Sequence, residues 1–460
     1  MSAACVCPKL RVWWATPNRE PMPQTQQKQI RRISISDSRS AALEALLLTD
    51  RGIAVQAALD TVFSKCDLGV SDRSLASELA YGVLRTGLTL DARLGEVLPK
   101  LNKLPVVVRH VLEIGLYSLL YAERVPAHAA INTAVALAKK RSGLRMGNLV
   151  NAVLRKLQEV PESTKSDNVW QNLAHEYALP AEILRLWRTH YGNAASLSLL
   201  RRSFARPWPA VRINAAYAKA ACLRKAFADE PFGKSIGSWG FAFPPGRVPI
   251  KVAGRSIFEW REQGALSQQA AGSQLVMEKL GLFSLKDSFW DCCAGVGGKS
   301  MVLLERGAKV ALCSDTSGKR LEQLVRDCRR LGLVCPKVLQ ADAAHYTPED
   351  FCGHILVDAP CSSLGVLARR PDVKKRDFSP ASLQYFVDTQ RAILDNVAFC
   401  LSVGYCLAYM TCTLNPAENE LQIRDFLAKH PNFILLSQWQ SPHSHPWLEG
   451  MFGALLQKTA

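Results

Sequence analysis

The sequence predicts a multidomain protein with an all-α bundle first, a small α+β module next and a Rossmann-like α/β domain last. Three observations lead to this prediction. The chain has 460 residues, enough for about three domains of ~150 residues each. Its first third repeats apolar residues at spacings of three and four, which indicates helices. Its last part alternates short apolar strands with helical segments, which is typical of a doubly wound parallel sheet.

Changes of composition divide the chain into five segments. Residues 1–36 carry six basic side chains against one acidic side chain, and we expect a disordered basic arm there. Residues 38–160 predict the helical bundle, and the polar residues 161–169 (PESTKSDNV) predict a linker. Residues 170–265 predict the small α+β module. Residues 266–460 predict the α/β domain.

The elements within these segments follow from local patterns. Helix-breaking residues mark where the helices of the bundle should end, namely Gly52, Gly69, Pro99, Pro105 and Pro126. In the module, PAVRINA and SIFEW predict strands. In the last segment, SFWD, KVALCSD, KVLQAD, HILVDAP and GYCLAYMTCT predict successive strands. Ligands of such sheets bind at the carboxyl ends of the strands.

Composition limits the possible partners. A formal net charge of +17 and a pI near 9.4 favour a polyanion such as nucleic acid. The longest apolar stretch, residues 398–410, falls short of the ~20 residues that cross a membrane, so we expect no membrane partner. The 14 cysteines are too sparse for a disulfide framework and form no C-x-x-C pair, so we expect no metal site. We expect a cytoplasmic monomer.

A glycine-rich turn, CCAGVGGKS at residues 292–300, follows the first predicted strand of the α/β domain. A phosphate-binding P-loop would need a glycine where Cys293 stands, so a nucleoside cofactor without a large phosphate group fits better. Glycines here would let the backbone approach such a ligand closely. We expect cofactor contacts from Cys293, Ala294, Gly295, Val296, Gly297, Gly298 and Lys299.

Carboxylates follow the next strands. Asp315 ends the second strand, where a carboxylate can bind ribose hydroxyls, and Asp342 follows the third. Together with Asp291 they place acids at three successive strand ends. This pattern favours S-adenosylmethionine or a dinucleotide as the cofactor.

Two thiols follow the fourth and fifth strands. HILVDAPC ends with Asp358 and Cys361, and GYCLAYMTC ends with Cys412. Because parallel strands end at one edge of a sheet, we expect both thiols and Asp358 to face the glycine turn. A thiol beside a carboxyl group is suited to nucleophilic catalysis.

Several segments resemble the RsmB/Sun (Fmu) family of ribosomal RNA cytosine-5 methyltransferases. The resemblance covers about residues 38–460, and it rests on DCCAGVGGKS, DAPCSSLG, RRPDVKK, YMTCTLNPAENE and EGMFGALLQK. RVPAHAAINTAVALAKK and NLVNAVLRKL look like the NusB-like RNA-binding domain that precedes the catalytic domain in such enzymes. The sequence departs from the family pattern at Val296, Ser363, Leu364 and Lys375.

The resemblance implies an S-adenosylmethionine-dependent enzyme that methylates C5 of a cytosine in small-subunit ribosomal RNA or its precursor particle. It implies that Cys412 attacks C6 of the base, that Cys361 helps release the product, and that Asp358 contacts the base and the cofactor's methionine end. The residues alone do not order the two thiols, because DNA cytosine methyltransferases attack from the Pro-Cys motif. Two alternatives are a cytosine-5 methyltransferase for DNA or another RNA and a catalytically silent RNA-binding assembly factor.

Basic clusters predict the contacts with RNA. Acid-poor stretches on a strongly positive chain favour binding to phosphates. The residues expected to bind RNA are Arg369, Arg370, Lys374, Lys375 and Arg376 after the Pro-Cys motif, Arg201 and Arg202 before the module's first strand, and Lys139 and Lys140 in the bundle.

Overall fold

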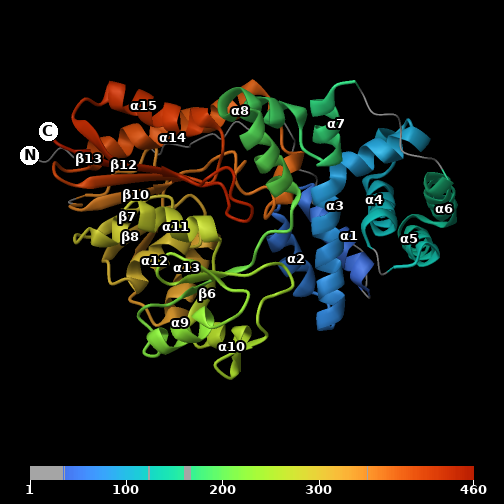
Figure 1. Cartoon of the computed structure of the whole chain (residues 1–460), viewed down its shortest axis with the longest axis horizontal. Helices are drawn as coiled ribbons and strands as arrows, with labels where there is room; N and C mark the ends of the chain where they lie inside the picture. Colours follow the sequence, from blue (N-terminus) through green and yellow to red (C-terminus); the bar gives the residue numbers. More distant parts are fainter. Residues whose placement is uncertain (1–34, 36, 123–124, 160–166, 350) are drawn as a thin grey trace, which may run out of the picture.

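The structure is a computed structural model that describes residues 35, 37–122, 125–159, 167–349 and 351–460 (Figure 1). Nearly all of the predicted basic arm and most of the predicted linker lie outside these described residues. None of the described helices is long and apolar enough to cross a membrane. Within the described ranges, no group of three or more His, Cys, Asp or Glu residues could hold a metal ion.

The first domain, residues 38–159, consists of helices, as the spacing of its apolar residues predicts. Its helices are α1 (Ser38–Thr49), α2 (Val55–Phe63), α3 (Val70–Val97), the short η2 (Leu101–Lys103), α4 (Val106–Tyr121), α5 (Ala127–Ser142) and α6 (Leu144–Glu159). Gly69, Pro105 and Pro126 stand directly before α3, α4 and α5, because glycine tolerates a helix-capping conformation and proline fits a helix start. These three predicted breakers therefore mark helix starts, whereas Gly52 and Pro99 follow the ends of α1 and α3 as predicted.

The small module consists of two helices followed by a sheet. Helices α7 (Val169–Glu176) and α8 (Ala181–Phe204) precede β1 (Ala210–Ile213), α9 (Ala220–Ala228), β2 (Lys234–Ile236), β3 (Gly240–Ala242), β4 (Lys251–Val252), β5 (Arg255–Ser256), α10 (Ile257–Glu262) and β6 (Leu266–Gln268). The main sheet has the order β2-β3-β1-β6, so it extends just past residue 265.

The strand expected over SIFEW is wrong, because most of this segment forms α10. Ser256 and Glu259 make reciprocal side-chain-to-backbone hydrogen bonds, a capping box that starts a helix. This local capping outweighs the strand preference of the isoleucine, phenylalanine and tryptophan that the segment contains.

The α/β domain surrounds a seven-stranded sheet of order β12-β13-β11-β10-β7-β8-β9. Its strands are β7 (Phe289–Asp291), β8 (Val310–Asp315), β9 (Lys337–Gln340), β10 (His354–Asp358), β11 (Cys406–Thr411), β12 (Phe433–Gln440) and β13 (Phe452–Lys458). Helices α11 (Ala271–Lys279), α12 (Gly298–Glu305) and α13 (Gly318–Leu331) lie on one side, and α14 (Pro380–Cys400) and α15 (Glu420–Lys429) lie on the other (Figure 1). Short η3 (Leu282–Ser284), η4 (Pro371–Lys375) and η5 (Pro416–Glu418) complete it.

The sheet is Rossmann-like but mixed rather than wholly parallel. Strands β7 to β11 run parallel, whereas β13 pairs antiparallel with both β11 and β12. The segment between β12 and β13 contains no helix, so the chain turns back and the two strands pair antiparallel. The five parallel strands carry the predicted glycine turn, acids and thiols.

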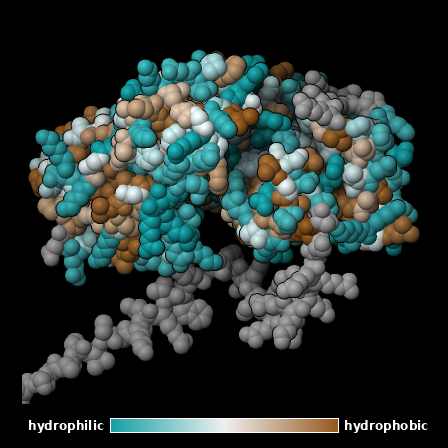
Figure 2. All heavy atoms as spheres, turned by 90° about the horizontal axis from the view of Figure 1, so that it is seen from below, coloured by the Kyte–Doolittle hydropathy of each residue, from teal (hydrophilic) through white to brown (hydrophobic). Residues whose placement is uncertain are grey.

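The domains are tied together by buried contacts. Trp187 and Leu199 of α8 pack with Leu364 and Leu414, which flank the two thiol segments. Arg212 of β1 forms a buried ion pair with Glu305 at the end of α12 (Nε–Oε2, 2.7 Å). Seen from below, the helical domain and the α/β domain stand as two lobes with a hollow between them (Figure 2).

Candidate active site

The glycine turn joins β7 to α12 and uses two left-handed glycines. Gly295 has a φ of +56°, and a Cβ added there would meet no atom within 4 Å. Its N–H donates to Oδ2 of Asp315 at 2.9 Å, which fixes the turn against the end of β8. Gly297 has a φ of +83°, and a Cβ there would lie 2.6 Å from Leu324 of α13. The turn therefore leaves its Gly295 side open and packs its Gly297 side against a helix.

A cavity of about 680 Å³ lies at the carboxyl edge of the parallel strands. This volume is in the range of small-molecule sites. Predicted cofactor residues line it, and Tyr385, Thr389 and Ile393 of α14 form part of its wall. The predicted residues present in the lining are Cys293, Ala294, Gly295, Val296, Gly298, Lys299, Asp315, Asp342 and Asp358. Gly297 is absent from the lining, because it packs against α13.

The three acids at strand ends have different surroundings. Asp315 and Asp342 line the cavity from β8 and from the loop after β9. Asp291 is fully buried, and Ser300 donates a hydrogen bond to its Oδ2 at 2.5 Å. Burial raises the pKa of Asp291 to about 7. Asp291 therefore packs beneath the turn instead of facing the cavity.

The two thiols lie side by side, as the sequence predicts. Cys361 follows β10 and Cys412 follows β11, and these strands pair in parallel with Asp358 opposite Met410. The two Sγ atoms are 3.3 Å apart. Cys361 is buried, and Cys412 is half-buried. Adjacent thiols beside a ligand cavity can divide attack and proton transfer between them.

The surroundings distinguish the two thiols electrostatically. The hydrogen bond with Cys361 lowers the pKa of Cys412, and Ser363 and Lys299 lower it further against burial and Asp358. The same hydrogen bond raises the pKa of Cys361, with burial adding to the effect. Cys412 is therefore the more acidic thiol, and once it is ionised Cys361 is the thiol that can donate a hydrogen bond to it.

Lys299 and Asp358 link the cavity to the thiols. The Nζ of Lys299 lies 2.5 Å from Oδ2 of Asp358, and both residues line the cavity. Burial lowers the pKa of Lys299, but the charges of Asp358 and Cys412 outweigh it and raise the pKa overall. Lys299 is therefore a cation at neutral pH and can stabilise a thiolate at Cys412.

Close backbone contacts hold the Cys361 segment against Cys412. The N–H of Gly365 donates to the carbonyl of Cys412 at 3.0 Å, and Gly450 donates to Gly365 O at 2.8 Å. A Cβ on Gly365 would lie 1.9 Å from the carbonyl oxygen of Gly450, so only glycine fits. Ser363 has a φ of +64°, and its Oγ lies 3.8 Å from the thiol of Cys412. A departure from the family pattern thus adds a hydroxyl beside this thiol.

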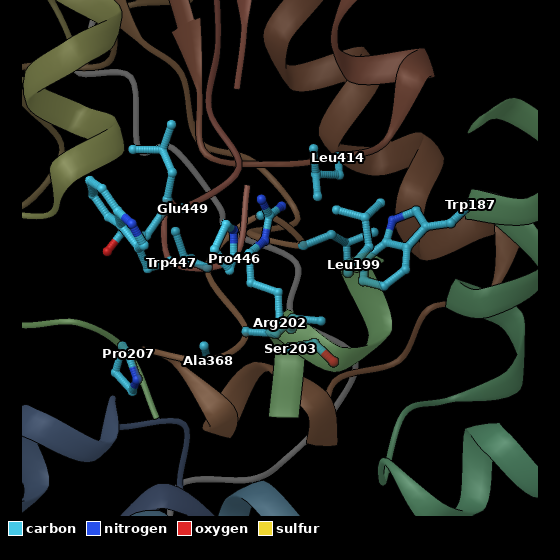
Figure 3. Close-up of a pocket in the computed structure, with 15 residues that line it drawn as sticks. Trp187, Leu199, Arg202, Ser203, Pro207, Ala368, Leu414, Pro446, Trp447 and Glu449 are labelled. Atoms are coloured by element: carbon cyan, nitrogen blue, oxygen red, sulfur yellow. The ribbon is translucent and has the colours of Figure 1, made fainter. Parts of the chain in front are cut away.

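Two residues expected to bind RNA are buried instead. Arg202 lies at the junction of α8 with the α/β domain, near Pro446 and Glu449 (Figure 3). Its Nη1 lies near backbone carbonyls at 3.4 and 3.5 Å, and the space left there is only about 20 Å³. Lys374 is 4% exposed and donates to the carbonyls of Arg85 and Tyr177. Neither side chain can reach an RNA phosphate.

The other basic residues divide into paired and exposed groups. Arg369 pairs with Glu449, Arg370 with Asp372, and Lys375 with Asp50 of the helical domain. The segment RRPDVKK thus joins domains as well as carrying charge. The exposed residues without an ion pair in the described part of the chain are Arg201 and Arg376. Lys139 and Lys140 are also exposed, on α5.

Sequence reasoning missed a buried polar group beneath the thiols. The side chain of Glu418 is buried and accepts hydrogen bonds from three other buried residues, Ser362, Gln390 and Asn415. The signal was present, because Glu418 and Asn415 lie within the quoted segment YMTCTLNPAENE. Such polar side chains beside a candidate nucleophile point to positioning rather than to simple packing.

Comparison with known proteins identifies the family. A model of the family "16S rRNA methyltransferase RsmB/F" matches residues 284–450, and a model of the NusB family matches residues 36–159. A curated relative from Synechocystis, "Probable ribosomal RNA small subunit methyltransferase B", is 32% identical over 84% of this chain and 87% of that relative. The chain belongs to the ribosomal RNA small subunit methyltransferase B family. A relative from Vibrio vulnificus with this family name is 30% identical over 92% of this chain and 99% of that relative.

Solved structures support the fold of this small subunit methyltransferase B family member. The structure of PH0851 has a TM-score of 0.76 and 22% identity, and it covers 93% of this chain and all of that chain. NSun6 from Pyrococcus horikoshii, solved with SFG, has a TM-score of 0.50 and 18% identity, and it covers 61% of this chain and 98% of that chain.

The cofactor of this methyltransferase, as of its family, is S-adenosylmethionine. The cavity fits this molecule, because it is of suitable volume and combines two carboxylates with a backbone turn that Gly295 leaves open. Asp315 and Asp342 can accept hydrogen bonds from ribose and adenine. Asp358 and Lys299 stand at the side of the cavity nearest the thiols.

Proposed function

We propose that this protein methylates C5 of a cytosine in small-subunit ribosomal RNA through a covalent bond between Cys412 and C6 of the base. The observation that carries the proposal is the pair of thiols 3.3 Å apart, with Asp358 and the cofactor cavity beside them. Curated relatives named for methylation of small-subunit ribosomal RNA support the choice of substrate.

Cytosine C5 is a weak nucleophile, so the reaction needs an activating step. The thiolate of Cys412 adds to C6, which breaks the C5–C6 double bond and gives C5 the electron density for attack. Asp358 lies near Cys412, where its side chain can hydrogen-bond to the base and hold C6 against the thiolate. The bound S-adenosylmethionine supplies the methyl group to C5.

Release of the product restores the starting thiols. A water molecule at the open side of the thiols takes the C5 proton, and the electrons of the C5–H bond form the C5–C6 double bond again. The bond between C6 and the Sγ of Cys412 breaks, and its electrons return to sulfur as the thiolate. Cys361 lies at hydrogen-bond distance from that sulfur and can stabilise it as it leaves. We therefore assign the attack to Cys412 and assistance in release to Cys361.

The ribosomal RNA reaches this site from the open side of the thiols. Cys412 is only half-buried, so a base extruded from its stack can approach it. Arg370 is partly exposed, and its charge interacts with Cys412. Arg201, Arg376, Lys139 and Lys140 remain as the exposed candidates for phosphate contacts.

The function is tested by the identity of the methylated nucleoside. The purified protein is incubated with S-adenosylmethionine carrying a labelled methyl group and with unmodified small-subunit ribosomal RNA, transfer RNA or DNA. We expect labelled 5-methylcytidine in the ribosomal RNA, identified by mass spectrometry of digested nucleosides. Label on an exocyclic nitrogen would contradict the thiol mechanism. Label on transfer RNA or DNA alone would favour the alternative substrates, and cofactor binding without methylation of any of them would favour a silent assembly factor.

A further inference from the structure

Glu418 lies at the end of η5, beneath the two thiol segments, and its side chain is completely buried. Its carboxylate receives four hydrogen bonds. Ser362 donates to it twice, through Oγ at 2.5 Å and through its N–H at 2.9 Å. The amides of Asn415 and Gln390 donate the other two, each at 2.9 Å. All four donors are neutral groups, and Glu418 takes part in none of the salt bridges in the described part of the chain.

These donors belong to the segments that carry the thiols. Ser362 directly follows Cys361, and its hydroxyl also lies 2.6 Å from the hydroxyl of Thr413, which directly follows Cys412. Asn415 belongs to the segment after Cys412, and its N–H donates to Oγ1 of Thr413 at 3.2 Å. One carboxylate therefore connects the residues next to both thiols.

The network extends to the helix that covers the sheet. Gln390 of α14 donates to Glu418 and also to the carbonyl of Pro360, both at 2.9 Å through Nε2. Pro360 directly precedes Cys361. The Cys361 segment is thus held from both sides, by Gln390 at Pro360 and by Glu418 at Ser362.

The charge of Glu418 affects the two thiols differently. The hydrogen bond with Cys412 and burial are the larger causes that raise the pKa of Cys361, and the negative charge of Glu418 raises it further. Lys299 and Ser363 act on the other thiol and lower the pKa of Cys412. The position of Glu418 thus favours a protonated Cys361 that donates to an ionised Cys412.

We propose that Glu418 is a positioning residue that holds the two thiol segments together and keeps Cys361 oriented as the hydrogen-bond donor to Cys412. This inference rests on the proposed function, in which Cys412 is the nucleophile. Glu418 acts through Ser362, Asn415 and Thr413 and does not itself touch the reacting atoms.

The test replaces Glu418 with glutamine, which keeps the size of the side chain and removes its charge. All four groups around the carboxylate are hydrogen-bond donors. The NH₂ group of glutamine is also a donor and cannot accept a hydrogen bond from them, so at least one of the four bonds is lost. We expect methylation to fall at least about tenfold in kcat, with the affinity for S-adenosylmethionine unchanged. A change of one pKa unit alters the thiolate fraction about tenfold at a pH below the pKa.

The distinguishing readout is the pH dependence of alkylation at each thiol, followed by mass spectrometry of the two peptides. In Glu418→Gln we expect Cys412 to need a higher pH for alkylation and Cys361 to react at a lower pH than in the wild type. Glu420→Gln is the matched control, since Glu420 accepts no hydrogen bond from the thiol segments in the described structure. Unchanged profiles at both thiols in folded Glu418→Gln would overturn the proposal.

Ser362→Ala is a second variant in case Glu418→Gln does not fold. It removes the hydroxyl bond to Glu418 but leaves the carboxylate charge in place, so we expect a lower kcat with a smaller change at Cys361. Normal turnover in folded Ser362→Ala would count against positioning through Ser362. The two proposals can fail separately, because the alkylation profiles need no RNA. Shifted profiles without 5-methylcytidine in the wild-type reaction would reject the function alone, and normal profiles with 5-methylcytidine would reject the role of Glu418 alone.

Discussion

Replacement of Cys412 with alanine is expected to abolish methyl transfer, with a loss in kcat of at least about 10⁴-fold, which is typical when a covalent nucleophile is removed. Without the thiolate, C5 of cytosine has no route to the electron density that the attack requires. The Cys412 side chain is half-buried, so the alanine variant should fold and retain S-adenosylmethionine. Single-turnover methylation of small-subunit ribosomal RNA measures the effect.

Cys222→Ala is the matched control for this variant. Cys222 is an exposed cysteine on α9, outside the α/β domain, and its loss should leave methylation at the wild-type rate. If Cys412→Ala still methylates RNA while Cys361→Ala does not, the roles of the two thiols are exchanged. That outcome would agree with attack from the Pro-Cys motif, as in DNA cytosine methyltransferases.

The second large effect is expected for Lys299→Met. Methionine fills much of the buried space but removes the cation that lowers the pKa of Cys412 and pairs with Asp358. The thiolate is needed for attack, so activity rises as pH increases through the pKa of Cys412. A raised pKa moves this acidic limb of the pH–rate profile to higher pH. For each unit by which the pKa of Cys412 rises, we expect about tenfold lower activity at pH 7. Activity should recover in part at pH 9.

A lysine away from the site provides the comparison for this variant. Lys286 is exposed and precedes β7, at the end of the strand opposite to the glycine turn, so Lys286→Met should keep the wild-type pH profile. Cofactor binding is measured separately for both variants, because Lys299 also lines the cavity. An unchanged acidic limb in Lys299→Met would show that Lys299 does not assist ionisation of Cys412.

Much of the site could be predicted because its residues follow from local patterns and sheet topology. The carboxyl ends of parallel strands meet at one edge, and this places Asp315, Asp342, Cys361 and Cys412 together without knowledge of any side-chain contact. The glycine turn is likewise a local strand-to-helix junction. Helix ends at glycine and proline are fixed by the backbone preferences of those residues.

Apart from the SIFEW segment, where a local capping box starts a helix, the errors came from contacts between residues far apart in the chain. Lys374 and Arg202 belong to basic stretches of sequence that look like surface clusters. In the structure, their side chains contact backbone carbonyls of other domains. Gly297 belongs to the glycine motif, yet its contact with Leu324 depends on how α13 packs. The antiparallel β13 and the network around Glu418 also depend on tertiary pairing, which single-sequence periodicity does not contain.

The covalent bond between Cys412 and the RNA is tested most directly with the Cys361→Ala variant. It is mixed with S-adenosylmethionine and unmodified small-subunit ribosomal RNA, and the mixture is run on a denaturing gel. Because Cys361 is assigned to product release, we expect a protein–RNA adduct that accumulates in this variant and is absent in the Cys361→Ala, Cys412→Ala double variant. An adduct that persists without Cys412, or RNA binding and methylation by Cys361→Ala with no adduct at any time, would contradict the mechanism.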